Sequence, residues 1–174
     1  MADAADAPRP SQLWKPLPAD RKLVAAEAFW RDDNAAAEQA EVLAAIAQRI
    51  KFRVKSVVAM PVDKKARQLV SLPAISEAVA ARLLVAYHLA HQRPMMGQFL
   101  EALGIAHEDG MISDEDVTPP AQERLAAAAG TLAASFPAAD VSLYLSTLVW
   151  QDPETWGSLA DLPEVRAGSH PPPG

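Results

Sequence analysis

Two histidines three residues apart are the first side chains whose types and spacing could do chemistry. His88 and His91 lie in the apolar stretch AYHLAHQRPMMGQF, and Arg93 follows them. Residues three apart share one face of a helix, so both imidazoles could reach one ion, and a histidine can also act as a general acid or base. The stretch is therefore a candidate pocket for a metal-dependent or histidine-based enzyme of the hydrolase type.

A second group of polar side chains follows in the segment AHEDG, where His107, Glu108 and Asp109 precede a glycine. Zinc takes at least three protein ligands, so a metal site at His88 and His91 needs a donor from this group. If a helix over 94–103 folds back on the helix over 74–92, however, the turn at 107–110 lies near the end of the 74–92 helix that is far from His91. His88 and His91 therefore stay weak metal candidates, and we predict no bound metal and no cofactor.

The elements around the two histidines also suggest structural roles for them. Pro94 disfavours helical geometry at the residue before it, so His91 falls in the last turn of its helix. The helix dipole favours a cation there. His88, one turn earlier, is expected to be a hydrogen-bonded residue of a buried helix.

A basic segment occupies residues 49–67, RIKFRVKSVVAMPVDKKAR. Its cations are Arg49, Lys51, Arg53, Lys55, Lys64, Lys65 and Arg67, and Asp63 is its one acid. The cations near residue 50 suit the end of a helix, whereas those at 64–67 stand at a helix start and have no such explanation. We therefore expect a surface that docks an acidic protein or a phosphate-bearing ligand.

Nucleic-acid binding through the same segment is a second alternative, because contacts to phosphates need such cations. A helix-turn-helix over 61–92 would present Ile75, Ser76 and Glu77 to the base edges. Apolar and acidic side chains at that place argue against sequence-specific recognition. The acidic stretch HEDGMISDEDVTPP lacks the spacing of a calcium-binding EF-hand, so we expect a solvated loop over 108–116 that forms a second contact surface.

Composition limits the class of protein. Half of the 174 residues are hydrophobic and none is cysteine, which excludes disulfides, thiolate metal sites and cysteine nucleophiles. Alanine makes up about a fifth of the chain, and this favours helix. We see no secretory signal and no apolar run that spans a bilayer, so we expect a cytoplasmic protein that does not enter a membrane.

Charge is unevenly distributed along the chain. Residues 1–93 hold 14 of the 16 lysines and arginines against 10 acids, whereas residues 94–174 hold 2 against 12. This asymmetry indicates a polarised surface, although attraction between the two halves would explain it as well.

Prolines and apolar periodicity predict an all-α fold, because six prolines each precede a segment of helical period. The predicted helices cover 18–32, 34–54, 61–71, 74–92, 94–103, 120–135, 137–151 and 153–160. Apolar residues point in all directions from the helix at 74–92, so we place it at the centre of a single bundle of seven or eight helices. Gly104 and Ile105 indicate a Schellman cap at the end of the fifth helix.

The predicted domain covers 17–163, between a flexible arm at 1–16 and a proline-rich tail at 164–174. LPADRKLVAAEAF at 17–29 resembles MPVDKKARQLVSL at 60–72, 43 residues later. We interpret both as good helix starts rather than as solenoid repeats. With no catalytic motif in the chain, the sequence favours a non-enzymatic module that binds a protein partner or ligand, or forms a homo-oligomer.

Overall fold

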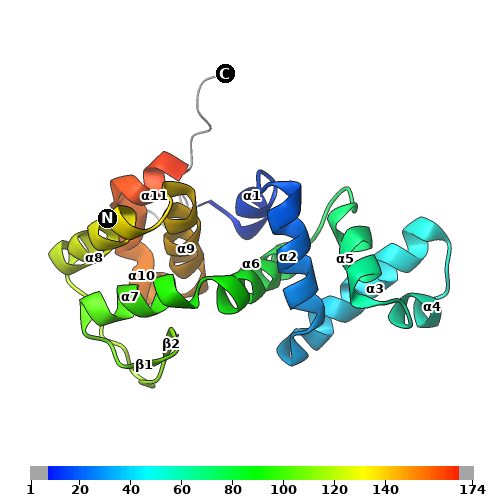
Figure 1. Ribbon diagram of the computed structural model, residues 1–174, viewed down its shortest axis with the longest axis horizontal. Helices are drawn as coiled ribbons and strands as arrows, with labels where there is room; N and C mark the ends of the chain where they lie inside the picture. The colour runs from blue at the N-terminus through cyan, green and yellow to red at the C-terminus, as the bar shows by residue number, and fades with distance from the viewer. Residues whose placement is uncertain (1–7, 169–174) are drawn as a thin grey trace. The chain divides into compact units, whose positions relative to one another are not determined.

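The computed structural model describes residues 8–168 and shows an all-α protein with one short β-hairpin in that range (Figure 1). Chain contacts divide it into two compact units. The N-terminal unit is Pro10–Ala90, and the C-terminal unit contains the chain from His91 onward. The boundary between the two units falls at the end of one helix, within the single domain expected over 17–163.

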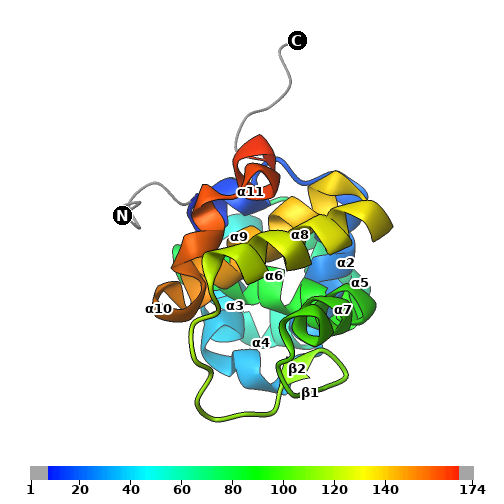
Figure 2. The same cartoon turned by 90° about the vertical axis from the view of Figure 1, so that its left-hand side faces the viewer.

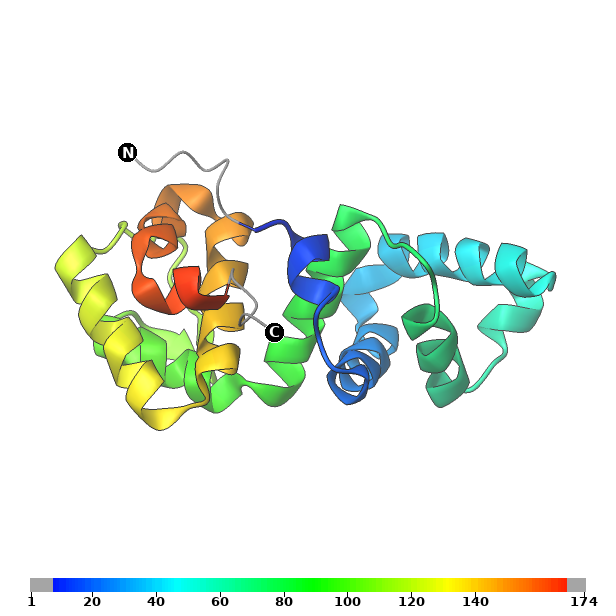
Figure 3. The same ribbon diagram turned by 90° about the horizontal axis from the view of Figure 1, so that it is seen from above.

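The N-terminal unit consists of helices joined by short turns. Its elements are α1 (Pro10–Trp14), α2 (Ala19–Trp30), the 3-10 turn η2 (Asp33–Ala35), α3 (Ala36–Ile50), α4 (Val54–Val58), α5 (Val62–Val70) and α6 (Glu77–His91). The helix expected over 34–54 ends at Ile50, because Lys51 takes the left-handed conformation with φ of 59°. Figures 1 and 3 show α4 as a separate short helix in the turn from α3 to α5.

Proline begins both helices of the near-repeat. Pro18 and Pro61 are the N-caps of α2 and α5, and both have φ of −58° and ψ of 151°. Their carbonyls accept the first helical hydrogen bonds, from Lys22 and Lys65, at 3.0 Å each. The interpretation of these segments as helix starts is confirmed, and α2 also packs directly against α5.

The matching lysines of the near-repeat each cover an indole ring. The Nζ atom of Lys22 lies 5.8 Å from the ring centre of Trp14, and that of Lys65 lies 4.9 Å from the ring centre of Trp30. A cation over an indole face is attracted by the ring quadrupole. These two lysines therefore help to hold the N-terminal unit together.

The chain ends differ from the expected arm and tail. Helix α1 lies within the expected arm, where Trp14 is buried and the backbone N–H of Ser11 donates to the Glu77 carboxylate at 3.0 Å. Helix α11 (Pro163–Gly168) lies within the expected tail, and its Val165 is buried. A buried apolar side chain orders each segment. Residues 1–7 of the arm and 169–174 of the tail lie outside the described residues.

The C-terminal unit begins with α7 (Arg93–Leu103), which leads into the hairpin β1 (His107–Glu108) and β2 (Met111–Ile112). Then follow α8 (Gln122–Ser135), α9 (Ala138–Gln151), α10 (Pro153–Trp156), the 3-10 turn η3 (Gly157–Asp161) and α11 (Figure 2). The predicted Schellman cap is confirmed: Gly104 has φ of 68°, and the N–H of Ile105 donates to the Leu100 carbonyl at 2.9 Å.

Two helices bury side chains around most of their circumference. Helix α6 buries seven side chains, as its apolar residues predicted. Helix α9 contacts α8, α10, η3 and α11, and every side chain from Asp140 to Thr147 is buried. The sequence did not reveal the second case, because Ser142, Ser146 and Thr147 make α9 look amphipathic. Thr147 satisfies its hydroxyl within the helix by donating to the Leu143 carbonyl at 2.7 Å.

Removing the Lys65 charge is expected to destabilise the N-terminal unit. Lys65→Gln loses the attraction to the Trp30 ring and should lower the free energy of unfolding by about 0.5–1 kcal/mol. Lys64→Gln is the matched control, because Lys64 is exposed and pairs with no group in residues 8–168. Urea denaturation of both variants measures the difference, and equal stabilities would contradict the role given to Lys65.

Candidate functional site

The segment AHEDG forms the tight turn that the sequence predicted. Asp109 and Gly110 have φ of 50° and 82°, the pair of positive angles that a two-residue hairpin turn requires. His107 pairs with Ile112 and Glu108 with Met111 in the antiparallel hairpin. The two strands themselves were not predicted, because each is only two residues long.

The hairpin turn lies against the beginning of α7. The Arg93 guanidinium donates to the Asp109 carbonyl at 3.0 Å and lies 3.4 Å from its carboxylate. A Cβ atom on Gly110 would come within 3.0 Å of the Arg93 carbonyl. The turn therefore lies beside the start of α7, because the hairpin reverses the chain along the helix.

His107 fastens the turn from the other side. Its Nδ1 accepts a hydrogen bond from the N–H of Gly110 at 3.1 Å, and its Nε2 lies 3.5 Å from a Glu101 oxygen. The imidazole sits on Gly97, where a Cβ atom would be 3.3 Å away. Arg93, His107 and Asp109 are thus brought together, and their contacts hold the turn in place. Glu108 points into solvent from the same hairpin.

The two histidines of the opening pair have different environments. His88 is 3% exposed within α6, and its ring packs edge-to-face on Tyr87 with centroids 5.5 Å apart. Burial lowers the pKa of His88 from 6.5 to about 3, so its imidazole is neutral at physiological pH. His91 is the exposed last residue of α6, as predicted. Across residues 8–168, no three histidine or carboxylate side chains come close enough together to hold a metal ion.

Three cations of the basic segment make contacts with other residues of the N-terminal unit. Arg49 donates to the Ser71 carbonyl and to its hydroxyl, the latter at 2.7 Å, and so ties α3 to the end of α5. Arg67 pairs with Asp63 at 2.9 Å, one helical turn away. Lys65 covers Trp30. The cations at 64–67 that seemed to lack a structural role therefore include two that have one.

The other four cations remain open to solvent. Lys51, Arg53, Lys55 and Lys64 are exposed, and none of them pairs with another group within residues 8–168. Three of them alternate with apolar side chains in the sequence from Lys51 to Lys55, and all of these side chains are exposed. We call the exposed side chains of this stretch the basic ridge, which comprises Lys51, Phe52, Arg53, Val54, Lys55 and Val58.

The ridge departs from the rule that large apolar side chains are buried. Phe52 is 55% exposed and Val58 is 51% exposed. The ridge begins at the left-handed residue Lys51, where α3 ends, and its two valines lie in the short helix α4. The sequence showed the cations and Phe52 together, but it did not show that the valines stay exposed as well.

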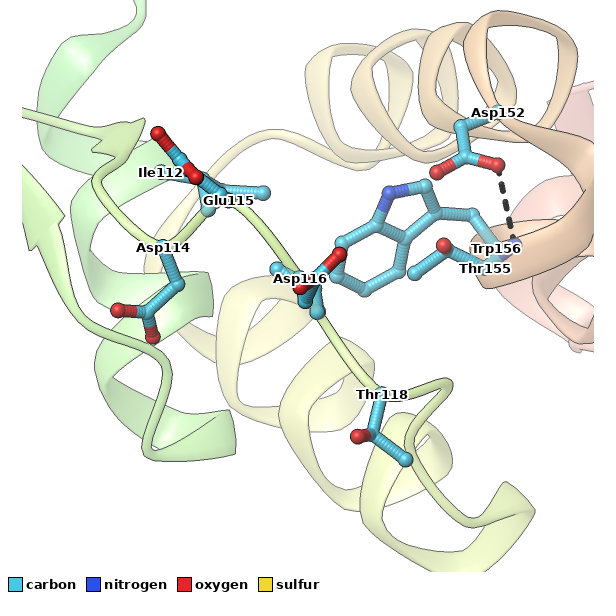
Figure 4. A pocket seen from close by; sticks show the side chains of 9 residues that line it. Ile112, Asp114, Glu115, Asp116, Thr118, Asp152, Thr155 and Trp156 are labelled. Carbon is cyan, nitrogen blue, oxygen red and sulfur yellow. Dashed lines mark hydrogen bonds between the residues drawn. The ribbon is translucent and has the colours of Figure 1, made fainter.

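Part of the acidic loop lines a pocket of about 480 Å³ in the C-terminal unit. Residues 112–118 form one side and α10 with its N-cap forms the other (Figure 4). We call it the acidic pocket, and the polar and aromatic side chains that line it are Asp114, Glu115, Asp116, Thr118, Asp152, Thr155 and Trp156. Nearly 40 residues separate its two sides in the sequence. The prediction of the acidic loop therefore found only one side.

Asp152 is the N-cap of α10 and holds the second side of the acidic pocket in place. Its carboxylate accepts a hydrogen bond from the Thr155 N–H at 3.1 Å. Hydrogen bonds from the Thr155 side chain and backbone lower the pKa of Asp152. The carboxylate is therefore ionised at neutral pH and contributes negative charge to the pocket.

Comparisons with known proteins give no further assignment: no family model matches the chain, and no curated protein or solved structure matches it either. Within residues 8–168, every helix is too short or too polar to cross a membrane. Within residues 8–168, the features that bear on function are the basic ridge, the hairpin and the acidic pocket.

Two glycines should respond in opposite directions to alanine. Gly110→Ala introduces a Cβ at φ of 82° against backbone, and we expect a loss of about 1–3 kcal/mol in the free energy of unfolding. Gly130→Ala in α8 meets no atom within 4 Å, and we expect a gain of about 0.5–1 kcal/mol. Thermal and urea unfolding measure both. An unchanged free energy of unfolding in Gly110→Ala would show that the hairpin does not lie against α7.

The stability of the protein should depend on pH through His88. Unfolded His88 takes up a proton as the pH falls below 6.5, whereas the folded residue does so only near 3. The free energy of unfolding therefore falls with falling pH in this window, by up to about 1.4 kcal/mol per pH unit from this residue. His88→Gln should have a shallower dependence between pH 6.5 and pH 3 when both proteins are denatured with urea. Parallel curves would show that His88 does not resist protonation.

Proposed function

We propose that the protein is a non-enzymatic interaction module whose basic ridge binds an acidic surface of a partner protein. The observation that carries this proposal is the alternation of cations and apolar side chains at Lys51–Lys55, all of them exposed. The cations have no partners among the described residues, so the fold does not use them. A surface with free charges and free apolar groups has both kinds of contact available to a partner.

The apolar side chains favour a partner protein over a nucleic acid. In the described part of the chain, the ridge contributes Phe52, Val54 and Val58 to the six large hydrophobic side chains that are exposed. Full burial of such a side chain contributes about 1.5–3 kcal/mol, which a phosphate backbone cannot supply but an apolar protein surface can. Aliphatic side chains also do not stack on bases as aromatic ones do.

The cations favour a partner with carboxylates around its apolar contacts. Charge complementarity speeds association and excludes partners of the wrong sign. The wider N-terminal unit supports this sign, because residues 10–90 carry 12 basic against 8 acidic side chains. We therefore expect apolar contacts at the centre of the interface and ion pairs with Arg53 and Lys55 around them.

A synthetic peptide in which Glu and Leu alternate is the probe for this surface. Isothermal titration calorimetry should detect its binding at low salt, with affinity that falls as salt is added because the ion pairs are screened. The double variant Arg53→Glu, Lys55→Glu should bind the peptide at least about tenfold more weakly, since it places like charges against the peptide.

The matched control is Lys15→Glu, Arg31→Glu. Both of these residues are exposed cations of the same unit outside the ridge, and the change in net charge is the same. It should bind the peptide within about twofold of the unchanged protein. Equal losses in the two double variants would show attraction by net charge alone and would overturn the proposed surface, as would tighter binding of duplex DNA than of the peptide.

A further inference from the structure

We infer that the hairpin of the C-terminal unit binds the basic ridge of a second copy of this chain, so that the protein associates with itself. This partner is a specific case of the acidic protein surface proposed above for the ridge, so it rests on that proposed function. Two observations carry the step to a second copy. The hairpin exposes apolar side chains on a face that is turned away from its own helix, and the charges around them complement those of the ridge.

One face of the hairpin is turned away from α7. His107 rests on Gly97 of α7, and its cross-strand partner Ile112 lies on the same face of the two-stranded ribbon. Successive side chains of a strand point to opposite faces. Glu108 and Met111, the neighbouring cross-strand pair, therefore lie on the outer face, and both are exposed. This outer face presents to solvent a methionine that is 50% exposed.

Exposed apolar side chains concentrate in the hairpin and in the basic ridge. Of the six large hydrophobic side chains that are exposed in the described part of the chain, three belong to the ridge and two, Met111 and Ile112, belong to the hairpin. The two valines of the ridge are one helical turn apart in α4 and share one face of that helix. Both stretches therefore gain from being covered, because the burial of apolar surface is favourable.

Carboxylates accompany the apolar side chains of the hairpin. Glu108 stands opposite Met111 in the hairpin register, and Ile112 lines the same pocket as Asp114 and Asp116. The Asp114 side chain points away from the other side of that pocket (Figure 4). The three carboxylates are exposed and pair with no cation in residues 8–168. We call this surface the hairpin patch, which comprises Glu108, Met111, Ile112, Asp114 and Asp116.

The hairpin patch and the basic ridge have similar composition and opposite charge. The ridge combines three cations with three exposed apolar side chains, whereas the patch combines three carboxylates with two. The units that carry them differ in the same sense, because residues 10–90 hold 12 basic against 8 acidic side chains and residues 91–174 hold 3 against 12. Contact between a ridge and a patch of two copies therefore pairs cations with carboxylates around apolar contacts, whereas two ridges or two patches repel each other.

Sedimentation velocity of the full chain at low salt measures the self-association. We expect the mean sedimentation coefficient to rise with protein concentration, and the dissociation constant to increase at least about tenfold at high salt because the ion pairs are screened. The Glu-Leu peptide should compete for the ridge and return the protein to monomer. A monomer at every protein concentration up to about 1 mM would overturn the inference.

Charge reversals identify the two contacting surfaces. Arg53→Glu, Lys55→Glu in the ridge and Glu108→Lys, Asp114→Lys in the patch should each weaken the self-association at least about tenfold, because like charges then face each other. An equimolar mixture of the two double variants should associate again, since each variant supplies the surface that the other lacks. A mixture that stays monomeric, or double variants that associate as the unchanged protein does, would contradict the pairing of ridge and patch.

The matched control for the patch is Glu123→Lys, Glu154→Lys. Both residues are exposed acids of the C-terminal unit outside the patch, and the change in net charge is the same. This variant should associate within about twofold of the unchanged protein, because exposed charges away from the contact are screened. Equal losses in the patch variant and its control would show attraction by net charge alone and would overturn the hairpin patch as the contact surface.

The apolar part of the contact is tested by a variant that leaves the charges unchanged. Met111→Ser should weaken the self-association about tenfold, because the contact then buries less apolar surface. Val24→Ser is the matched control, because it removes an exposed apolar side chain that belongs to neither surface. Circular dichroism checks that both variants are folded. Equal effects of the two changes would show that the outer face of the hairpin is not buried on association.

The outcomes separate self-association from the function proposed for the ridge. A protein that binds the Glu-Leu peptide but stays monomeric keeps its proposed function and has a partner other than itself, which overturns the present inference alone. A protein that associates in spite of both charge reversals uses other surfaces, which has the same consequence. Failure to bind both the peptide and a second copy would overturn the proposed function as well.

Discussion

The structure depends on the fixed φ of proline at its helix starts. Pro18, Pro61 and Pro137 are N-caps with φ of −58°, −58° and −57°, while Pro94 and Pro153 stand in the first turn of their helices. A proline there has no N–H to leave unsatisfied and cannot continue a preceding helix. These prolines therefore fix the residue at which each of these helices begins. The starting residue in turn determines which side chains of the helix face the core.

Contacts within the folded protein use some of the charged side chains of the basic segment and leave others exposed. Arg49 closes the contact between α3 and α5, Lys65 covers an indole, and Arg67 pairs along its own helix. What is left is the basic ridge in one unit and the carboxylates of the acidic pocket in the other. The two surfaces have opposite sign because the acids and bases are segregated along the chain.

The sequence predicted local features well and long-range ones poorly. Proline positions, apolar periodicity and Gly104 located most helices and the Schellman cap, because these signals act within one or two turns. The return of the hairpin along α7 depends on Gly97 and Gly110 lying close together in space, which no local pattern shows. The acidic pocket combines segments nearly 40 residues apart. The division into two units depends on which helices share a core, and periodicity alone does not show this.

We propose the basic ridge as the surface by which the protein binds a partner. Nuclear magnetic resonance of the isotope-labelled full chain, titrated with the Glu-Leu peptide, tests it residue by residue. We expect the backbone amide shifts to concentrate at residues 51–58 and to saturate together. Shifts that spread evenly over the lysines and arginines of the chain, or that leave residues 51–58 unchanged, would contradict it.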